Sequence, residues 1–173
     1  MKHFTLEEFY RSATASKFGI INKPFAKKDI EEVEKNLNLL CDNILDPLRE
    51  KMDAPIYVSS GYRCKELNRR LCGAKNSQHL VGKAADITMN TYSKNLLLAD
   101  ALLSLELPFD QLILERTDPD PFHYAWLHVS YDKDRQRREV LICYKGEYRI
   151  PNTDYNLTLV YLADKIREGL IKY

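Results

Sequence analysis

Three side chains that can bind a divalent metal ion stand in two separate parts of this sequence. His79 and Asp86 share one stretch rich in small residues, and His128 lies far downstream. Two neutral imidazoles, one carboxylate and a water molecule form a tetrahedral zinc site with an open position, with ligand distances of about 2 Å. Zinc in such a site polarises a carbonyl group and lowers the pKa of its water toward about 7. These residue types therefore predict a site for one Zn²⁺ ion.

Strand alternation explains how these residues could meet. Residues 84–89 and 126–131 read as strands in which apolar and polar positions alternate. The alternation places Asp86 on one face of the first strand and His128 on one face of the second, with apolar residues on the opposite faces. If the two polar faces coincide, His79 can reach them from the loop that precedes Asp86. The metal site then lies on one side of a sheet.

Helical patterns surround these strands. Thr5 and Glu8 form a capping box that begins a short helix, and Gly73 can end another helix. Pro47 interrupts a long helical pattern, so we expect a kink or a break near Asp46. We predict helices over 5–12, 27–52, 65–71, 93–105 and 157–171, strands over 55–59, 84–89, 109–114, 126–131 and 140–144, and loops over 16–24, 74–83 and 148–155.

The order of these elements predicts an α+β fold. Several predicted strands are joined by turns that are too short for parallel crossovers, so we expect a small, mainly antiparallel sheet flanked by helices. A chain of 173 residues with 45% hydrophobic composition is long enough for one full core. The sequence shows no repeat, low-complexity tract or linker, so residues 1–173 are expected to form a single, monomeric domain.

Composition and charge argue against several classes of protein. With 26 basic and 25 acidic residues, the chain lacks the basic excess of a general nucleic-acid binder. No apolar run approaches the roughly 18 to 20 residues that cross a bilayer, and the N-terminus lacks the apolar core of a signal peptide. We therefore expect synthesis in the cytoplasm. The four cysteines show no paired spacing, which favours reduced and mostly buried thiols: Cys41, Cys64, Cys72 and Cys143.

Three motifs resemble those of a known family, the zinc D-alanyl-D-alanine peptidases, which includes D,D-carboxypeptidases, D,D-dipeptidases and phage L-alanyl-D-glutamate endolysins. The motifs are Ser59-Ser60-Gly61-Tyr62-Arg63, Ser77-Gln78-His79-x-x-Gly82-x-Ala84-x-Asp86 and Trp126-x-His128-x-Ser130. The resemblance runs from the first predicted helix to about Tyr131, and the nearest subgroup is the single-domain, phage-like one. It implies the fold of the hedgehog proteins and D,D-peptidases, and peptidoglycan peptides as substrates.

The resemblance also implies roles for individual residues. The metal ligands of the family correspond to His79, Asp86 and His128. Its arginine corresponds to Arg63, whose guanidinium could bind a substrate carboxylate or stabilise a developing oxyanion, with a structural salt bridge as the alternative. Ser77 and Gln78 are expected to hold the metal loop or to bind substrate.

One position departs from the family. Many members carry an acidic general base three residues before the second histidine ligand, where this chain has Ala125. Glu115 is the best replacement, because alternation along the strand over residues 109–114 places it on the polar face. Asp118 and Asp120 are the runners-up. His123 could contact substrate, although a surface histidine is the simpler interpretation.

Three classes of function remain open from the sequence. The first is a zinc peptidase that cleaves peptidoglycan stem peptides, either as a carboxypeptidase or as an endopeptidase. The second is a metal-containing cell-wall-binding protein that has lost catalysis, because Ala125 replaces the usual base. The third is a structural phage or cell-wall protein that keeps only the fold. An enzyme without a signal peptide could reach the cell wall by phage-type release.

Overall fold

The structure is a computed structural model that describes residues 1–117 and 124–149. Its strands are β1 (Tyr57–Ser60), β2 (Ala84–Thr88), β3 (Gln111–Arg116), β4 (Tyr124–Ser130), β5 (Glu139–Tyr144) and β6 (Glu147–Arg149). Its helices are α1 (Leu6–Tyr10), α2 (Ala13–Phe18), α3 (Lys27–Leu40), the π-helical η1 (Cys41–Leu45), α4 (Asp46–Met52), α5 (Lys65–Arg70), the 3₁₀-helical η2 (Gln78–Val81) and α6 (Tyr92–Ser104). No helix in these ranges is long and apolar enough to span a bilayer.

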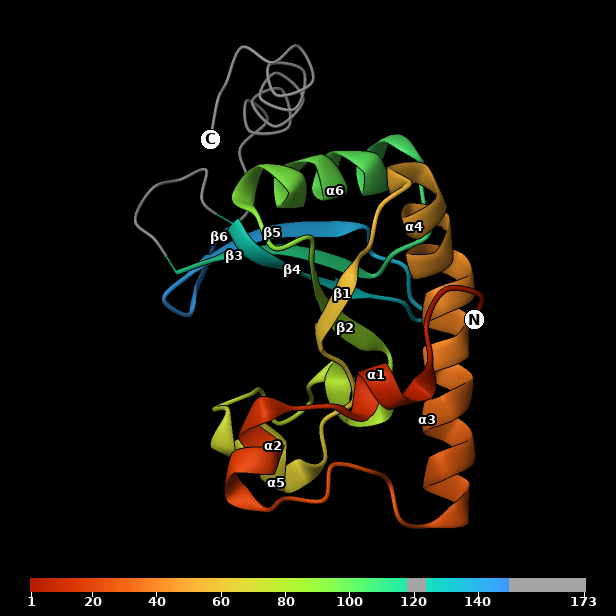
Figure 1. Cartoon of the computed structure of the whole chain (residues 1–173), viewed down its shortest axis with the longest axis vertical. Coiled ribbons are helices and arrows are strands. Elements are labelled where there is room, and N and C mark those ends of the chain that lie inside the picture. The colour runs from red at the N-terminus through yellow and green to blue at the C-terminus, as the bar shows by residue number, and fades with distance from the viewer. Residues whose placement is uncertain (118–123, 150–173) are drawn as a thin grey trace.

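The six strands form one sheet in the order β1–β2–β4–β3–β5–β6 (Figure 1). All neighbouring pairs are antiparallel except β3 and β5, which are parallel. The connection from β4 to β5 passes the start of β3, where the Asp110 N–H donates to the Ser130 carbonyl at 2.8 Å and the Glu139 N–H donates to the Asp110 carbonyl at 3.0 Å. The predicted α+β fold with a mainly antiparallel sheet is confirmed.

The sheet has one apolar face and one polar face. Helix α6 lies along the apolar face (Figure 1), where burying each large aliphatic side chain contributes about 1.5 to 3 kcal/mol. Fully or nearly fully buried residues of this core include Ile87, Leu98, Leu102, Leu112, Leu114, Leu127 and Val129. On the opposite face, Asp86, Glu115 and His128 line a cavity. The alternation predicted from the sequence is confirmed in all three central strands.

The predicted helix over residues 27–52 is continuous but not uniformly α-helical. Helix α3 runs into η1, in which the Asp46 N–H bonds to the Cys41 carbonyl, and α4 follows directly. Pro47 therefore stands in the first turn of α4, where its missing N–H has the least effect. The irregularity that Pro47 predicted is a π-helical turn just before Asp46, and the helical path does not end there.

Two loop predictions were wrong, and the loop predicted over 74–83 contains the 3₁₀-helical η2. The loop predicted over 16–24 overlaps helix α2, which begins with a bond from the Ala15 N–H to the Ser12 hydroxyl and ends at Gly19 with φ of 64°. The loop predicted over 148–155 begins in strand β6, which pairs with β5. The helix predicted over 157–171 lies outside the described residues.

Gly73 has a different role from the predicted one. Helix α5 ends at Arg70, and Cys72 takes the left-handed conformation, with φ of 54°. A Cβ atom at Gly73 would stand 2.3 Å from the Asn68 Oδ1. The glycine therefore permits close approach of the backbone to Asn68, which in turn donates to the Ala74 carbonyl at 2.9 Å and fixes the start of the loop over residues 74–83.

Candidate metal centre

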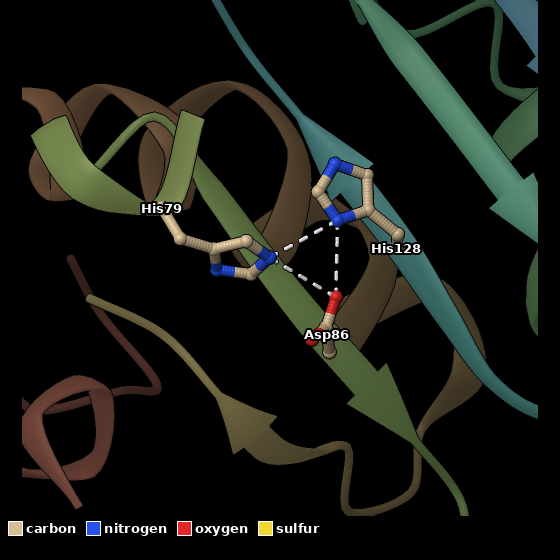
Figure 2. Close-up of side chains that lie close together, drawn as sticks. All are labelled: His79, Asp86 and His128. Carbon is tan, nitrogen blue, oxygen red and sulfur yellow. Dashed lines mark hydrogen bonds and ion pairs between the residues drawn. The ribbon is translucent and has the colours of Figure 1, made fainter. Parts of the chain in front are cut away.

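Two strands and one short helix bring His79, Asp86 and His128 together. His79 lies in η2, while Asp86 and His128 occupy directly opposite positions in the paired strands β2 and β4. Cross-strand neighbours on one face have Cβ atoms about 4.5 to 5.5 Å apart, so the strand register alone places the carboxylate beside the imidazole. All three side chains are buried, and Figure 2 shows them pointing toward one common point.

The ligand atoms have the spacing of three corners of a small tetrahedron. The distance from His79 Nε2 to His128 Nδ1 is 3.1 Å, from His79 Nε2 to Asp86 Oδ1 is 3.2 Å, and from His128 Nδ1 to Asp86 Oδ1 is 3.0 Å. Tetrahedral zinc with bonds of about 2.0 to 2.1 Å places its ligand atoms about 3.3 Å apart. The three atoms could hold a metal ion after shifts of a few tenths of an ångström.

The three facing atoms of this cluster have fewer protons than they need to form hydrogen bonds with one another. The Nδ1 of His79 lies 2.6 Å from the Gly61 carbonyl, which can only accept, so that nitrogen carries the ring proton. The neutral ring then presents a lone pair at Nε2, facing the Asp86 carboxylate oxygen. The Nδ1 of His128 can supply at most one proton to these two acceptors. A cation at the centre would relieve the remaining repulsion, and the donor set therefore fits zinc.

Burial and charge favour the ionisation states that a metal site needs. Burial lowers the pKa of His79, which keeps its imidazole neutral. Burial opposes ionisation of Asp86, whereas the positive charge of His79 or His128 when protonated, and a hydrogen bond from either ring, favour it, so the pKa of Asp86 lies below its usual range. The cluster thus combines a carboxylate with a neutral ring, as metal ligation requires.

Arg63 lies beside the cluster and forms an ion pair with the second oxygen of Asp86. Its Nε donates to the Ser60 hydroxyl at 2.8 Å, and its backbone N–H donates to the His79 carbonyl at 3.0 Å. The arginine is thus a salt-bridge partner of Asp86, the alternative that the sequence had left open. Its predicted contact with a substrate carboxylate or oxyanion stays a prediction, and its side chain, 15% exposed, lines the cavity.

Glu115 shares the polar face and lines the same cavity as the cluster. Burial and the charge of Asp86 raise the pKa of Glu115 above its usual range, and His128 acts in the opposite direction. The other acidic candidates for the general base, Asp118 and Asp120, lie outside the described residues, as does His123.

The cavity beside the cluster has a volume of about 400 Å³, within the range of sites for small ligands. Both residues predicted to hold the loop or bind substrate, Ser77 and Gln78, line it. Gln78 also donates to the Asp110 carboxylate at 2.8 Å, which ties the metal loop to the start of β3. The lining residues that the sequence reasoning missed include Arg135, Leu141 and Tyr148. Alternation along β5 could have indicated Leu141, whereas nothing local marked the other two.

Comparison with known proteins agrees with this geometry. The sequence model of the family described as peptidase M15 matches residues 2–118, more than half of the chain. The match includes His79 and Asp86 but ends before His128, which the pairing of β2 with β4 brings to the site. No curated protein is similar enough in sequence to match the chain. M15 peptidases are zinc-dependent, and the chain belongs to this peptidase family.

Proposed function

We propose that the protein is a zinc-dependent peptidase that hydrolyses peptidoglycan stem peptides. One observation carries the proposal: two imidazole nitrogens and a carboxylate oxygen, 3.0 to 3.2 Å apart and short of protons, open onto a cavity in an M15 peptidase chain. The motif resemblance to D-alanyl-D-alanine peptidases and L-alanyl-D-glutamate endolysins supports the substrate class.

In this proposal His79, Asp86 and His128 hold one zinc ion. When bound, zinc supplies a Lewis acid and lowers the pKa of a water molecule toward about 7. Gly61 keeps the His79 ring in the tautomer that presents Nε2, and Arg63 holds Asp86 in place through its second carboxylate oxygen. These contacts fix the ligands before any ion or substrate binds.

Glu115 is the proposed general base. Its carboxylate takes a proton from the attacking water and returns it to the amine of the leaving peptide. Two observations support the assignment: Glu115 lines the cavity, and it lies on the same face of the sheet as Asp86 and His128. Ala125, at the position where the family often has its base, cannot serve in this role.

The remaining features of the proposal concern where the enzyme acts. It would be made in the cytoplasm and reach the cell wall by phage-type release, working as a monomer without nucleic acid or membrane insertion. The bond that it cleaves is a terminal D-Ala-D-Ala bond, an L-Ala-D-Glu bond or a cross-link.

The test uses purified peptidoglycan and defined stem peptides. We expect the zinc-loaded protein to release D-alanine or new amino termini, and a chelator to abolish that release until zinc is restored. Mass spectrometry of the products identifies the bond. A zinc-loaded protein that binds peptidoglycan but releases nothing would contradict the enzyme and support the cell-wall-binding alternative.

A further inference from the structure

Arg135 stands where two cavities adjoin. It lines the cavity of about 400 Å³ beside the metal centre and also a second cavity of about 540 Å³. Residues 76–78 line both cavities as well, so this short stretch and Arg135 form their common wall. The Arg135 side chain is 55% exposed. A peptide that extends from the metal centre into the second cavity would therefore pass the guanidinium of Arg135.

Arg135 has one side-chain partner, Asp110, and it shares that partner with Arg137. Arg135 donates to the Asp110 carboxylate at 3.1 Å. The same carboxylate is fully buried and already accepts two bonds of 2.8 Å from the guanidinium of Arg137. Arg137 has a second partner, because its Nη1 also pairs with Glu139 at 2.8 Å. Nearby Asp132 bonds to Lys83 at 2.8 Å, and within residues 1–117 and 124–149 Arg135 has no second ion pair.

The second arginine of the cavity is committed elsewhere. Arg63 is only 15% exposed and bonds to both Asp86 and Ser60. Ser77, in contrast, is half-buried, and its hydroxyl makes no hydrogen bond within the described part of the chain. Because Ser77 and His79 are two residues apart, their Cα atoms lie within about 7 Å. An anionic group beside Arg135 and Ser77 would therefore lie in the cavity that adjoins the metal centre.

We propose that Arg135, with Ser77, binds a carboxylate of the substrate. The inference rests on the proposed peptidase function and gives the cavity a specificity-determining residue. A guanidinium and a hydroxyl form charge-assisted hydrogen bonds to carboxylates. The one side-chain bond from Arg135 to Asp110 leaves other donors of its guanidinium unused in the described part of the chain. Two groups of a stem peptide have this chemistry: the C-terminal carboxylate and the free carboxylate of a glutamyl residue.

The experiment combines the Arg135→Gln substitution with amidation of either of two substrate carboxylates. Wild-type protein and Arg135→Gln are loaded with zinc, and kcat/KM is measured on matched stem peptides with the C-terminal carboxylate free or amidated, and with the glutamyl carboxylate free or amidated. We expect wild type to prefer one free carboxylate by about 10- to 100-fold, the range of a charge-assisted hydrogen bond. Arg135→Gln should lose that preference, mainly through KM. The amidation that removes the preference identifies the carboxylate.

A matched control separates binding from charge and folding. Lys133 lies in the same turn, is 59% exposed and lines neither cavity, so Lys133→Gln should leave the preference unchanged. Arg135→Lys should restore part of it. Zinc content and melting temperature should match wild type in all three variants. A wild-type enzyme indifferent to both amidations, or equal losses on free and amidated peptides in Arg135→Gln, would overturn the proposal.

If no peptide is cleaved, the proposed peptidase function is rejected. A binding measurement still tests whether Arg135 binds a carboxylate. D-alanyl-D-alanine, a stem peptide with a free glutamyl carboxylate and the amide of each are titrated into the zinc-loaded protein by calorimetry. An affinity that depends on one free carboxylate and is lost in Arg135→Gln would support carboxylate binding by Arg135 even without turnover. Equal affinities for acids and amides would reject it.

Discussion

Asp86 lies in β2 and Asp110 lies just before β3, and both are buried carboxylates, yet their surroundings differ in one decisive respect. Asp110 receives hydrogen bonds from two arginines and one glutamine, all of which carry protons to donate. Asp86 receives an arginine on one oxygen, but its other oxygen faces two imidazole nitrogens that share at most one proton. Both carboxylates are buried and both pair with arginine. The supply of protons is what separates a structural ion pair from a candidate metal site.

The largest difference in zinc affinity is expected between variants that neutralise Asp86 and Asp110 separately. Asp86→Asn removes an anionic ligand, so we expect zinc affinity to fall by more than about 100-fold and activity to be lost. Asp110→Asn should keep zinc, because its carboxylate faces only proton donors. Zinc titration with a competing chelator measures both. Loss of zinc in the two variants alike would remove the distinction between the sites.

Glu115 lines the same cavity as Asp86, but it is not a proposed metal ligand. Glu115→Gln should therefore keep zinc and lower kcat by about 10²- to 10⁴-fold, the usual contribution of a general base. Glu147→Gln serves as the control, because that side chain is exposed and pairs with Arg149. Activity close to wild type in Glu115→Gln would exclude this residue as the base.

Arg63 should support the metal centre without being part of it. Lysine cannot bond to Asp86 and Ser60 together as the guanidinium does, so Arg63→Lys should weaken zinc binding by about 10- to 100-fold. Arg70→Lys, at an arginine that covers the ring of Phe18, is the matched control. Unchanged zinc affinity in Arg63→Lys, measured against the same chelator, would show that the ion pair does not orient Asp86.

The smallest effect is expected in the stability that Asp110 contributes. Although burial acts in the opposite direction, hydrogen bonds from Arg137 and Gln78 lower the pKa of Asp110 to about 2. A lowered pKa in the folded state means that this stabilisation is complete above the unfolded value of about 3.9 and is lost as the pH falls through about 2. Wild type should lose about 2 kcal/mol relative to Asp110→Asn over that window.

Denaturant unfolding of both proteins between pH 2 and 6 checks this expectation. Parallel curves for wild type and Asp110→Asn across the window would mean that the ion pairs of Asp110 contribute no net stability.

The positions of the metal-site residues could be predicted from the sequence more completely than the helices and turns around them. Alternation in two strands was enough to place Asp86 and His128 on one face, because side-chain direction in a strand has a period of two. Helix α2 was missed although Ser12 and Gly19 mark its ends, since six residues carry little periodicity. Glycine was the obvious residue for the left-handed position after α5, yet Cys72 occupies it, and Gly73 is needed instead where Asn68 leaves no space for a Cβ atom.

The approach of distant segments could not be predicted locally. Arg135 comes from the β4–β5 connection, and Tyr148 from a strand added beyond β5. Their positions depend on the parallel pairing of β3 with β5, which sets β5 beside β3 although β4 lies between them in sequence. Strand order of this kind depends on contacts across the whole chain, and no residue motif marks it.

The central claim concerns the point enclosed by His79 Nε2, Asp86 Oδ1 and His128 Nδ1. Crystals of the zinc-loaded protein, measured on both sides of the zinc absorption edge, test it most directly. We expect one anomalous peak at about 2 Å from each of the three atoms, with one equivalent of zinc per chain in solution. A fully occupied peak elsewhere, or zinc-equilibrated crystals with no peak between these three side chains, would contradict it.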